Sequence, residues 1–264
     1  MTEPSREILP RPDLVREFSA PAVATISDCA PSGRVRLDAI ARWLQDVAYA
    51  DIRDVELESV AVWVVRRTRI RVNRWPRFGE RVRLTTFVTG LGRMWAERRT
   101  DVWRRSEREP ARGRPDVEGM SLWVHLDPER RLPFPLTEAE VTTYSGPTPQ
   151  RRITARLRHP GPPPAPDRRS SSWTFRATEC DLADHVNNVA YWLPLEEELL
   201  RCGSDADPAL PLDVELEYRA PAQPGTMRWV SDGFTRWIVG GDGAGEDEVH
   251  ASFLLQPPEP GAEG

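Results

Sequence analysis

The sequence predicts an α+β protein built from two similar halves, each with one helix and several antiparallel strands. Three observations predict this class: an apolar stripe at helical spacing, strand-like segments after it, and a second copy of the same order of elements. The chain of 264 residues is long enough for two modest domains. The stripe consists of Leu37, Ile40, Ala41, Leu44 and Val47, in a helix that we expect to begin near Arg36.

The strands expected in the first half flank this helix in the chain. Residues 18–26 form a strand before it, and four strand-like segments follow at residues 61–72, 81–90, 94–105 and 119–127. The segment VWVVRRTRIRV alternates apolar residues with arginines, which is typical of a strand with one buried face. The sheet is therefore expected to bury the helix on one face.

The second half repeats this order. It begins with a strand over residues 172–178 and continues with a helix from His185 to Cys202. The strands predicted after this helix cover residues 213–221, 227–234, 235–241 and 249–256. A repeated helix-and-strands unit of this kind indicates a tandem arrangement.

A segment rich in proline and arginine, without apolar periodicity, separates the halves. It is predicted to be a linker, and at about 3.3 Å per extended residue it is long enough to cross the face of a domain. The predicted divisions are a first domain at 11–146, the linker at 147–171, a second domain at 172–257 and a disordered tail at 258–264.

The composition excludes several classes of protein. No apolar run approaches the roughly 20 residues of a membrane span, and the acids and prolines of the opening segment argue against a signal peptide, so we expect a cytoplasmic protein. The net charge of -5 does not suggest nucleic acid as a partner. Three cysteines without a CxxC pair argue against a disulfide framework and a zinc site, and neither a metal nor a cofactor is expected.

Every basic side chain other than histidine is an arginine, because the sequence contains no lysine. Two groups of arginines could offer a basic patch to an acidic partner, or could instead be solvated strand faces. The groups are Arg66, Arg67, Arg69, Arg71 and Arg74, and Arg98, Arg99, Arg104 and Arg105.

The segment RATECDLADHVNNVAYWLPLEE, from Arg176 to Glu197, carries the residues best suited to chemistry. It resembles the signature of the plant and bacterial acyl-ACP thioesterases, in which an aspartate precedes His-Val-Asn-Asn and a helix. The segment from Trp63 to Phe87 is similar to a second motif of that family, as are SLWVHLD and LEYR. Together the likeness covers roughly residues 18–146 and 172–256.

The resemblance implies a tandem double hotdog, with two antiparallel sheets each wrapped around a central helix. It also implies an enzyme of fatty acid biosynthesis that hydrolyses fatty acyl thioesters carried on the phosphopantetheine of acyl carrier protein. Water is the acceptor in that reaction, so no cofactor is required. A tandem supplies its own pairing of halves, and the chain is expected to be a monomer or a homodimer.

The resemblance assigns the central catalytic roles to Asp181 and His185. Asp181 would accept a proton from water or hold it in line, and His185 would orient the water or act as general acid or base. The amides from Val186 to Asn188 are candidates for an oxyanion hole at a helix start, with Asn187 and Asn188 in support. The alternative is structural: an aspartate is a common helix cap, and a histidine beside it can bond a strand carbonyl.

Three positions depart from the family pattern. Ala183 and Pro221 stand where the family has an asparagine and a glutamate, and Ala222 stands at the family's cysteine, which excludes a thiol nucleophile there. Glu197 is expected on the inner face of the helix, where it could replace the missing carboxylate or pair with an arginine.

The first half lacks an Asp-His pair, so its expected task is to hold the acyl chain. Trp43, Leu44 and Trp63 are candidates to line the pocket, although each could equally belong to the core. The rival functions are an acyl-CoA thioesterase, a hotdog dehydratase or hydratase, and a catalytically weak acyl-binding protein.

Overall fold

The structure of the protein is a computed structural model. The residues that this structure describes are 8, 15–58, 60–104, 113–145, 153–164, 169–201, 210–240 and 248–256. The strands are β1 (Glu17–Val23), β2 (Val62–Val72), β3 (Arg81–Leu91), β4 (Trp95–Arg104), β5 (Val117–Leu126), β6 (Arg169–Phe175), β7 (Leu212–Tyr218), β8 (Gly225–Asp232), β9 (Thr235–Val239) and β10 (Val249–Gln256). The helices are α1 (Leu37–Asp54), α2 (Glu138–Tyr144) and α3 (Leu193–Arg201), with short 3-10 turns at η1 (Ile26–Asp28), η3 (Ala177–Glu179) and η4 (Ala190–Trp192).

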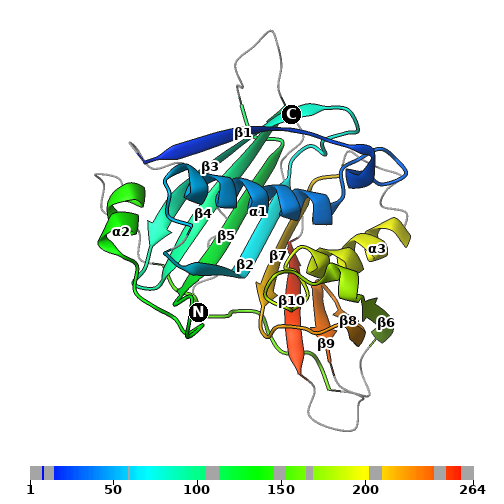
Figure 1. Cartoon of the computed structure of the whole chain (residues 1–264). Coiled ribbons are helices and arrows are strands. Elements are labelled where there is room, and N and C mark those ends of the chain that lie inside the picture. The colour runs from blue at the N-terminus through cyan, green and yellow to red at the C-terminus, as the bar shows by residue number, and fades with distance from the viewer. Residues whose placement is uncertain are drawn as a thin grey trace.

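The strands form one antiparallel sheet that runs through both halves. Its order is β1-β3-β4-β5-β2-β7-β10-β9-β8-β6, and β2 pairs with β7 from Arg67 opposite Glu217 to Val72 opposite Leu212. The α+β double hotdog predicted from the resemblance is therefore observed, with its two sheets joined edge to edge. The β2–β7 ladder is the seam between the halves (Figure 1).

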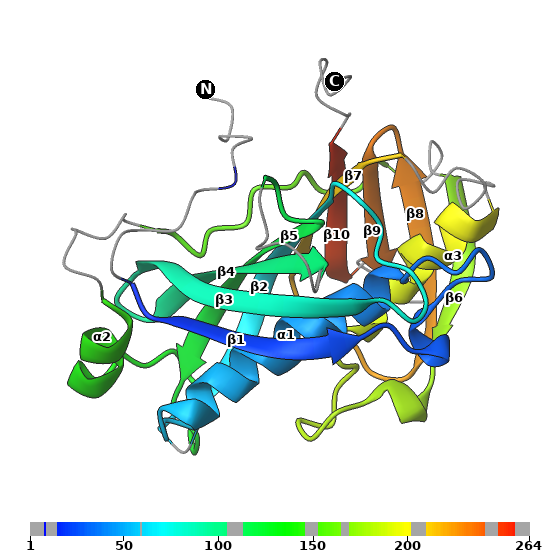
Figure 2. The same cartoon turned by 90° about the horizontal axis from the view of Figure 1, so that it is seen from above.

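Helix α1 lies along one face of the first-half strands (Figures 1 and 2). The predicted stripe is buried in it: Leu37, Ile40, Leu44 and Val47 are each 4% exposed or less. These side chains share one core cluster with Trp192, Phe175 and Phe253 of the second half. The halves thus bury a common apolar core, which is the main force that holds them together.

The long second helix predicted from His185 is wrong at its start. Residues 185–189 are not helical, and a 3-10 turn leads into α3 at Leu193. A bridge between Cys180 and Val186, and a hydrogen bond from Val186 N–H to Ala222 O, fold this stretch back on itself. Pro194 follows at the second position of α3, where no helical hydrogen bond is lost.

Helix α2 was not predicted, because its seven residues are too short for a periodic signal. Thr137 and Glu140 form a capping box at its start. The Nε2 atom of buried His125 on β5 lies 3.1 Å from a carboxylate oxygen of Glu140, which fastens the helix to the sheet.

Most of the arginines in the two groups named above are buried, so they form neither an exposed basic patch nor a solvated strand face, and both interpretations are wrong for them. Arg67, Arg69, Arg71, Arg98 and Arg99 are each 9% exposed or less. Their guanidinium groups pair with carboxylates on neighbouring elements, such as Asp213 on β7 for Arg69 and Arg71. Arg105 lies outside the described residues. These arginines serve the interior electrostatics of the sheet and are not available to a docking partner.

The segment 153–164, within the predicted linker, has no regular structure and lies against the sheet. Ile153 O accepts a hydrogen bond from Trp95 of the first half, and Pro160 O accepts one from Trp237 of the second. The domain divisions at 147 and 171 stay predictions, and the predicted tail at 258–264 lies outside the described residues. In the described part of the chain, the helices are all too short or too polar to cross a membrane.

Candidate active site between the two halves

A small cavity of about 10 Å³ lies between α1 and the start of the second-half turn. The first half contributes Ala41, Leu44, Gln45, Val65, Thr68, Ser121 and Trp123, and the second half contributes Asn188, Val189 and Tyr218. Its volume is that of about one water molecule. Because it joins predicted residues of both halves, Leu44 and Asn188, we take it as the candidate active site.

Asp181 and Asn187 meet directly on the exposed side of the motif. One carboxylate oxygen of Asp181 accepts the side-chain N–H of Asn187 at 3.0 Å, and the other accepts the backbone N–H of Ala183 at 2.8 Å. Asn187 in turn accepts the N–H of Val189 through its own side-chain oxygen at 2.9 Å. The carboxylate therefore has a fixed orientation and remains open to water.

The side chains of Asp181 and His185 are not paired. The two residues share only the hydrogen bond from Asp181 N–H to His185 O, at 3.0 Å. Within the described residues, the half-buried imidazole of His185 forms no hydrogen bond or ion pair. The adjacent Asp184 has a left-handed backbone with φ of 60°, which turns the chain between the two residues.

Of the three amides considered for an oxyanion hole, two are already occupied. Val186 N–H donates to Ala222 O at 3.0 Å, and Asn187 N–H donates to Glu179 O at 2.8 Å. The N–H of Asn188 has no acceptor among the described residues. Asn188 also lines the cavity, so its amide is the remaining candidate donor.

Glu197 does not lie on the inner face as expected. It pairs with Arg201 one turn later at 2.7 Å, where the side chains of Arg201 and Glu197 are 77% and 43% exposed. The buried carboxylate is its neighbour Glu196, which pairs with Arg34 at 2.9 Å and accepts Leu37 N–H at the start of α1. The 3-10 turn before α3 changes the helical phase, which a continuous helix counted from Val186 cannot anticipate.

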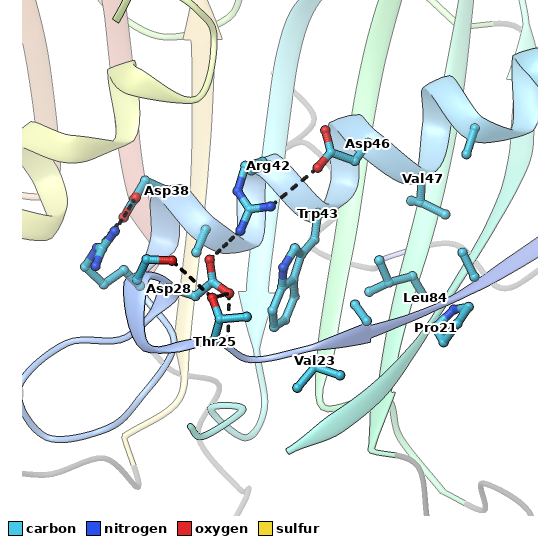
Figure 3. A pocket seen from close by; sticks show the side chains of 16 residues that line it. Pro21, Val23, Thr25, Asp28, Asp38, Arg42, Trp43, Asp46, Val47 and Leu84 are labelled. Carbon is cyan, nitrogen blue, oxygen red and sulfur yellow. Dashed lines mark hydrogen bonds and ion pairs between the residues drawn. The ribbon is translucent and has the colours of Figure 1, made fainter. Parts of the chain in front are cut away.

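The three predicted acyl-binding residues lie in different places. Leu44 lines the cavity between the halves, whereas Trp63 contacts the ring of His125 at a centroid distance of 4.9 Å and does not line it. Trp43 lines a larger hollow of about 570 Å³ between β1 and α1 (Figure 3). Asp181 and His185 line neither this hollow nor the cavity between the halves, and Asn188 lines only the cavity. The rim of the hollow is charged by Asp28, Arg42 and Asp46.

Sequence reasoning missed five polar or aromatic residues that line the cavity: Gln45, Thr68, Ser121, Trp123 and Tyr218. Strand alternation could have placed three of them, Thr68, Ser121 and Trp123, on the helix-facing side of the sheet, where Thr68 and Ser121 stand out as polar. Tyr218 donates its hydroxyl to Asn188 O at 3.0 Å and accepts Trp192 Nε1–H at 3.1 Å. Burial raises the pKa of the Tyr218 hydroxyl, so it stays a neutral donor.

A second tyrosine supports the motif from behind. The Tyr191 hydroxyl accepts the N–H of Ala222 at 2.8 Å and lies 3.5 Å from Ala220 O. Burial raises its pKa to about 12, against the opposing hydrogen bond from Ala222. The segment at Ala222, where the family pattern has a cysteine, is therefore a buried support for Val186 and Tyr191.

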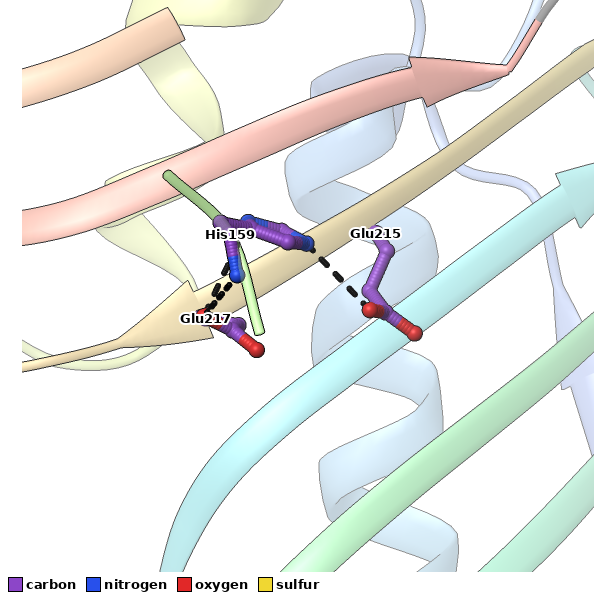
Figure 4. A group of neighbouring side chains, drawn as sticks. All are labelled: His159, Glu215 and Glu217. Carbon is purple, nitrogen blue, oxygen red and sulfur yellow. Dashed lines mark hydrogen bonds and ion pairs between the residues drawn. The ribbon is translucent and has the colours of Figure 1, made fainter. Parts of the chain in front are cut away.

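One group in the described chain has the composition of a metal site: His159, Glu215 and Glu217 (Figure 4). Both oxygens of Glu217 already accept backbone N–H groups, from Arg158 at 2.6 Å and His159 at 3.1 Å. Arg219 lies 3.6 Å from Glu217, and Arg67 lies 3.7 Å from Glu215. Because cations and amides already satisfy these carboxylates, the group serves to attach segment 153–164 to the sheet.

The fold and the cavity define a double-hotdog protein whose candidate site lies at the junction of its halves. Residues 23–144 match the family model described as the acyl-ACP thioesterase N-terminal domain. This match confirms the likeness to the acyl-ACP thioesterase family that the motifs indicated, and it supports thioester hydrolysis as the chemistry.

Two solved structures share the fold over nearly the whole chain. An acyl-ACP thioesterase from Bacteroides thetaiotaomicron has a TM-score of 0.67 at 17% identity, covering 91% of this chain and 98% of its own. A 12:0-ACP thioesterase from Umbellularia californica has a TM-score of 0.63 at 16% identity, covering 92% and 98%. An uncharacterized protein of Mycobacterium tuberculosis is 28% identical over 232 residues, which are 84% of this chain and 85% of the relative.

Proposed function

We propose that the protein hydrolyses acyl thioesters carried by acyl carrier protein, releasing a carboxylic acid and the carrier thiol. The observation that carries this proposal is the position of Asn188, whose N–H has no acceptor in the described chain and which lines the cavity. A free backbone donor at a turn into a helix suits the oxyanion of an attacked thioester. The choice of carrier rests on the family likeness.

Asp181 is the proposed general base. Its carboxylate is exposed and is held by Asn187 and Ala183, so it can accept a proton from water while the water oxygen bonds to the carbonyl carbon. The carbonyl oxygen becomes an oxyanion that Asn188 N–H stabilises. Collapse of this intermediate breaks the carbon-sulfur bond, and the carrier thiolate leaves and takes up a proton.

His185 has the supporting role in this proposal. Its imidazole has no partner in the described chain, so it is free to orient the water or to protonate the leaving sulfur. A thiolate is a good leaving group, and little acid assistance is required. We therefore expect His185 to contribute less to the rate than Asp181.

The experiment that tests the proposal is a hydrolysis assay with acyl-carrier and acyl-CoA substrates, with Asp181→Asn beside the unaltered protein. Release of free acid that Asp181→Asn abolishes supports the proposal. Hydrolysis of acyl-CoA but not of the acyl carrier would assign the site to CoA thioesters. Enoyl or hydroxyacyl products would indicate a dehydratase or hydratase, and acyl binding without release of acid would indicate a binding protein.

A further inference from the structure

The cavity between the halves has a polar side that a plain alkyl chain does not require. The hydroxyl groups of Thr68 on β2 and Ser121 on β5 lie 3.4 Å apart and face the cavity together. These two residues are direct partners in the β2–β5 ladder. The first half thus presents two hydroxyl groups to the cavity.

Trp123 adds an unused donor to this polar side. Its Nε1 atom is buried and has no hydrogen-bond partner among the described residues, although the indole lines the cavity. A buried donor without an acceptor costs free energy, unless a water or a ligand oxygen fills the place. Ser121 and Trp123 share one strand face, because alternate side chains of a strand point to the same side.

The space beyond this polar side is closed. Leu44 of α1 packs so tightly on Gly119 that a Cβ atom at position 119 would lie 2.5 Å from a Leu44 methyl carbon. Farther along α1, Asp51 forms a buried ion pair with Arg98, with 2.6 Å between the guanidinium nitrogen and the carboxylate oxygen. A long saturated chain between α1 and the sheet would have to displace Leu44 and then meet this ion pair.

We propose that the acyl group admitted here, when the side chains around this one-water cavity move apart, is short and carries a hydroxyl or keto oxygen, which accepts the hydrogen bond of Trp123 Nε1–H. The hydroxyl groups of Thr68 and Ser121 complete the oxygen-binding side, and Leu44 limits the chain length. This inference rests on the proposed thioester hydrolysis and adds the chemical class of the acyl group.

The test compares kcat/KM for carrier-linked butanoyl, 3-hydroxybutanoyl, 3-oxobutanoyl, 4-hydroxybutanoyl and dodecanoyl thioesters. We expect at least one oxygenated substrate to exceed butanoyl by about tenfold, the effect of one buried hydrogen bond. In Trp123→Phe the ratio of kcat/KM for the oxygenated substrate to kcat/KM for butanoyl is expected to fall close to one. Trp103→Phe is the matched control, because strand alternation places Trp103 on the opposite sheet face from Arg98 and Val102.

The outcomes separate this inference from the proposed function. If none of the substrates is hydrolysed, the proposed function fails. If dodecanoyl and butanoyl are turned over as well as the oxygenated substrates, hydrolysis stands and the inference is overturned. An equal loss on all substrates in Trp123→Phe would also overturn it, because the indole would then serve the thioester carbonyl common to them all.

A second pair of variants tests the length limit without removing a donor. Leu44→Ala opens space beside Gly119 and is expected to raise kcat/KM for decanoyl or dodecanoyl thioesters relative to butanoyl by about tenfold. Adding Gly119→Ala to Leu44→Ala refills part of that space and should reverse the gain. An unchanged length profile in both variants would show that Leu44 does not limit the chain.

Discussion

Arg34 of the first half and Glu196 of the second half form an ion pair at 2.9 Å, and both side chains are only 3% exposed. The guanidinium of Arg34 also lies over the Trp75 ring, 4.5 Å from its centroid. Glu196 accepts Leu37 N–H at 3.0 Å and so provides the carboxylate cap of α1 from the other half. The helix that covers the first half therefore depends on the second half for its N-terminal stabilisation.

Replacing Glu196 by Gln should destabilise the protein strongly, because it removes the buried negative charge that pairs with Arg34 and faces the N-terminus of α1. We expect the free energy of unfolding to fall by about 3 kcal/mol. Glu197→Gln is the matched control, since its exposed pair with Arg201 contributes about 0.5 kcal/mol or less. Urea unfolding followed by tryptophan fluorescence measures both, and equal losses would contradict the assigned roles of the two glutamates.

Asp181→Asn should reduce kcat by about 10²–10⁴-fold without a change in the thermal unfolding midpoint, because the side chain is exposed and its proposed role as general base concerns the reaction and not packing. Asp184→Asn is the control: it is an exposed carboxylate nearby, and asparagine tolerates its left-handed backbone. Initial rates on the best substrate measure the effect. Full activity of Asp181→Asn would remove this residue from the mechanism.

The pair of His125 and Glu140 should make stability depend on pH. Burial opposes the charge of His125, but the Glu140 carboxylate and Phe134 O together raise its pKa above the ordinary 6.5. Burial likewise opposes the charge of Glu140, but His125 and Thr137 lower its pKa below the ordinary 4.5.

Because the pKa of His125 is raised in the folded state, its protonation stabilises the fold fully below about pH 6.5. This stabilisation is lost as the pH rises through the pKa of His125 in the folded protein. Because the pKa of Glu140 is lowered in the folded state, its ionisation stabilises the fold above about pH 4.5, and this stabilisation is lost as the pH falls through the pKa of Glu140 in the folded protein. The unfolding midpoint should therefore decline from pH 6 to pH 9 more steeply than in His125→Gln. Parallel curves for the two proteins would contradict the prediction.

His159→Ala should release segment 153–164 from the sheet. The imidazole bonds Ser252 O at 3.1 Å and approaches Glu215 at 3.2 Å, while the amides of residues 158 and 159 donate to Glu217. Hydrogen exchange of these two amides is expected to accelerate at least tenfold. His185→Ala, at a half-buried histidine of the motif, should leave their exchange unchanged.

The elements whose pattern is local could be predicted from the residues alone. The stripe of α1, the alternation of the strands and the order repeated in the second half predicted the α+β class, and the motif at Asp181 to Asn188 drew attention to the turn that borders the cavity. These features depend on the spacing of apolar and polar residues along the chain, which needs no knowledge of distant contacts.

Which charges are buried, and which distant residues are in contact, depends on the packing of the two halves and could not be predicted. Glu196 and Glu197 are indistinguishable by type, and a 3-10 turn of three residues selects the one that reaches Arg34. The arginines of β2 pair with carboxylates on β7, a strand about 145 residues later in the chain. The register of the β2–β7 ladder, which brings them together, is set by the packing of the two halves. The cavity combines Leu44, Trp123 and Asn188 for the same reason: contacts between remote segments follow from how the sheet and helices pack, and local spacing does not encode them.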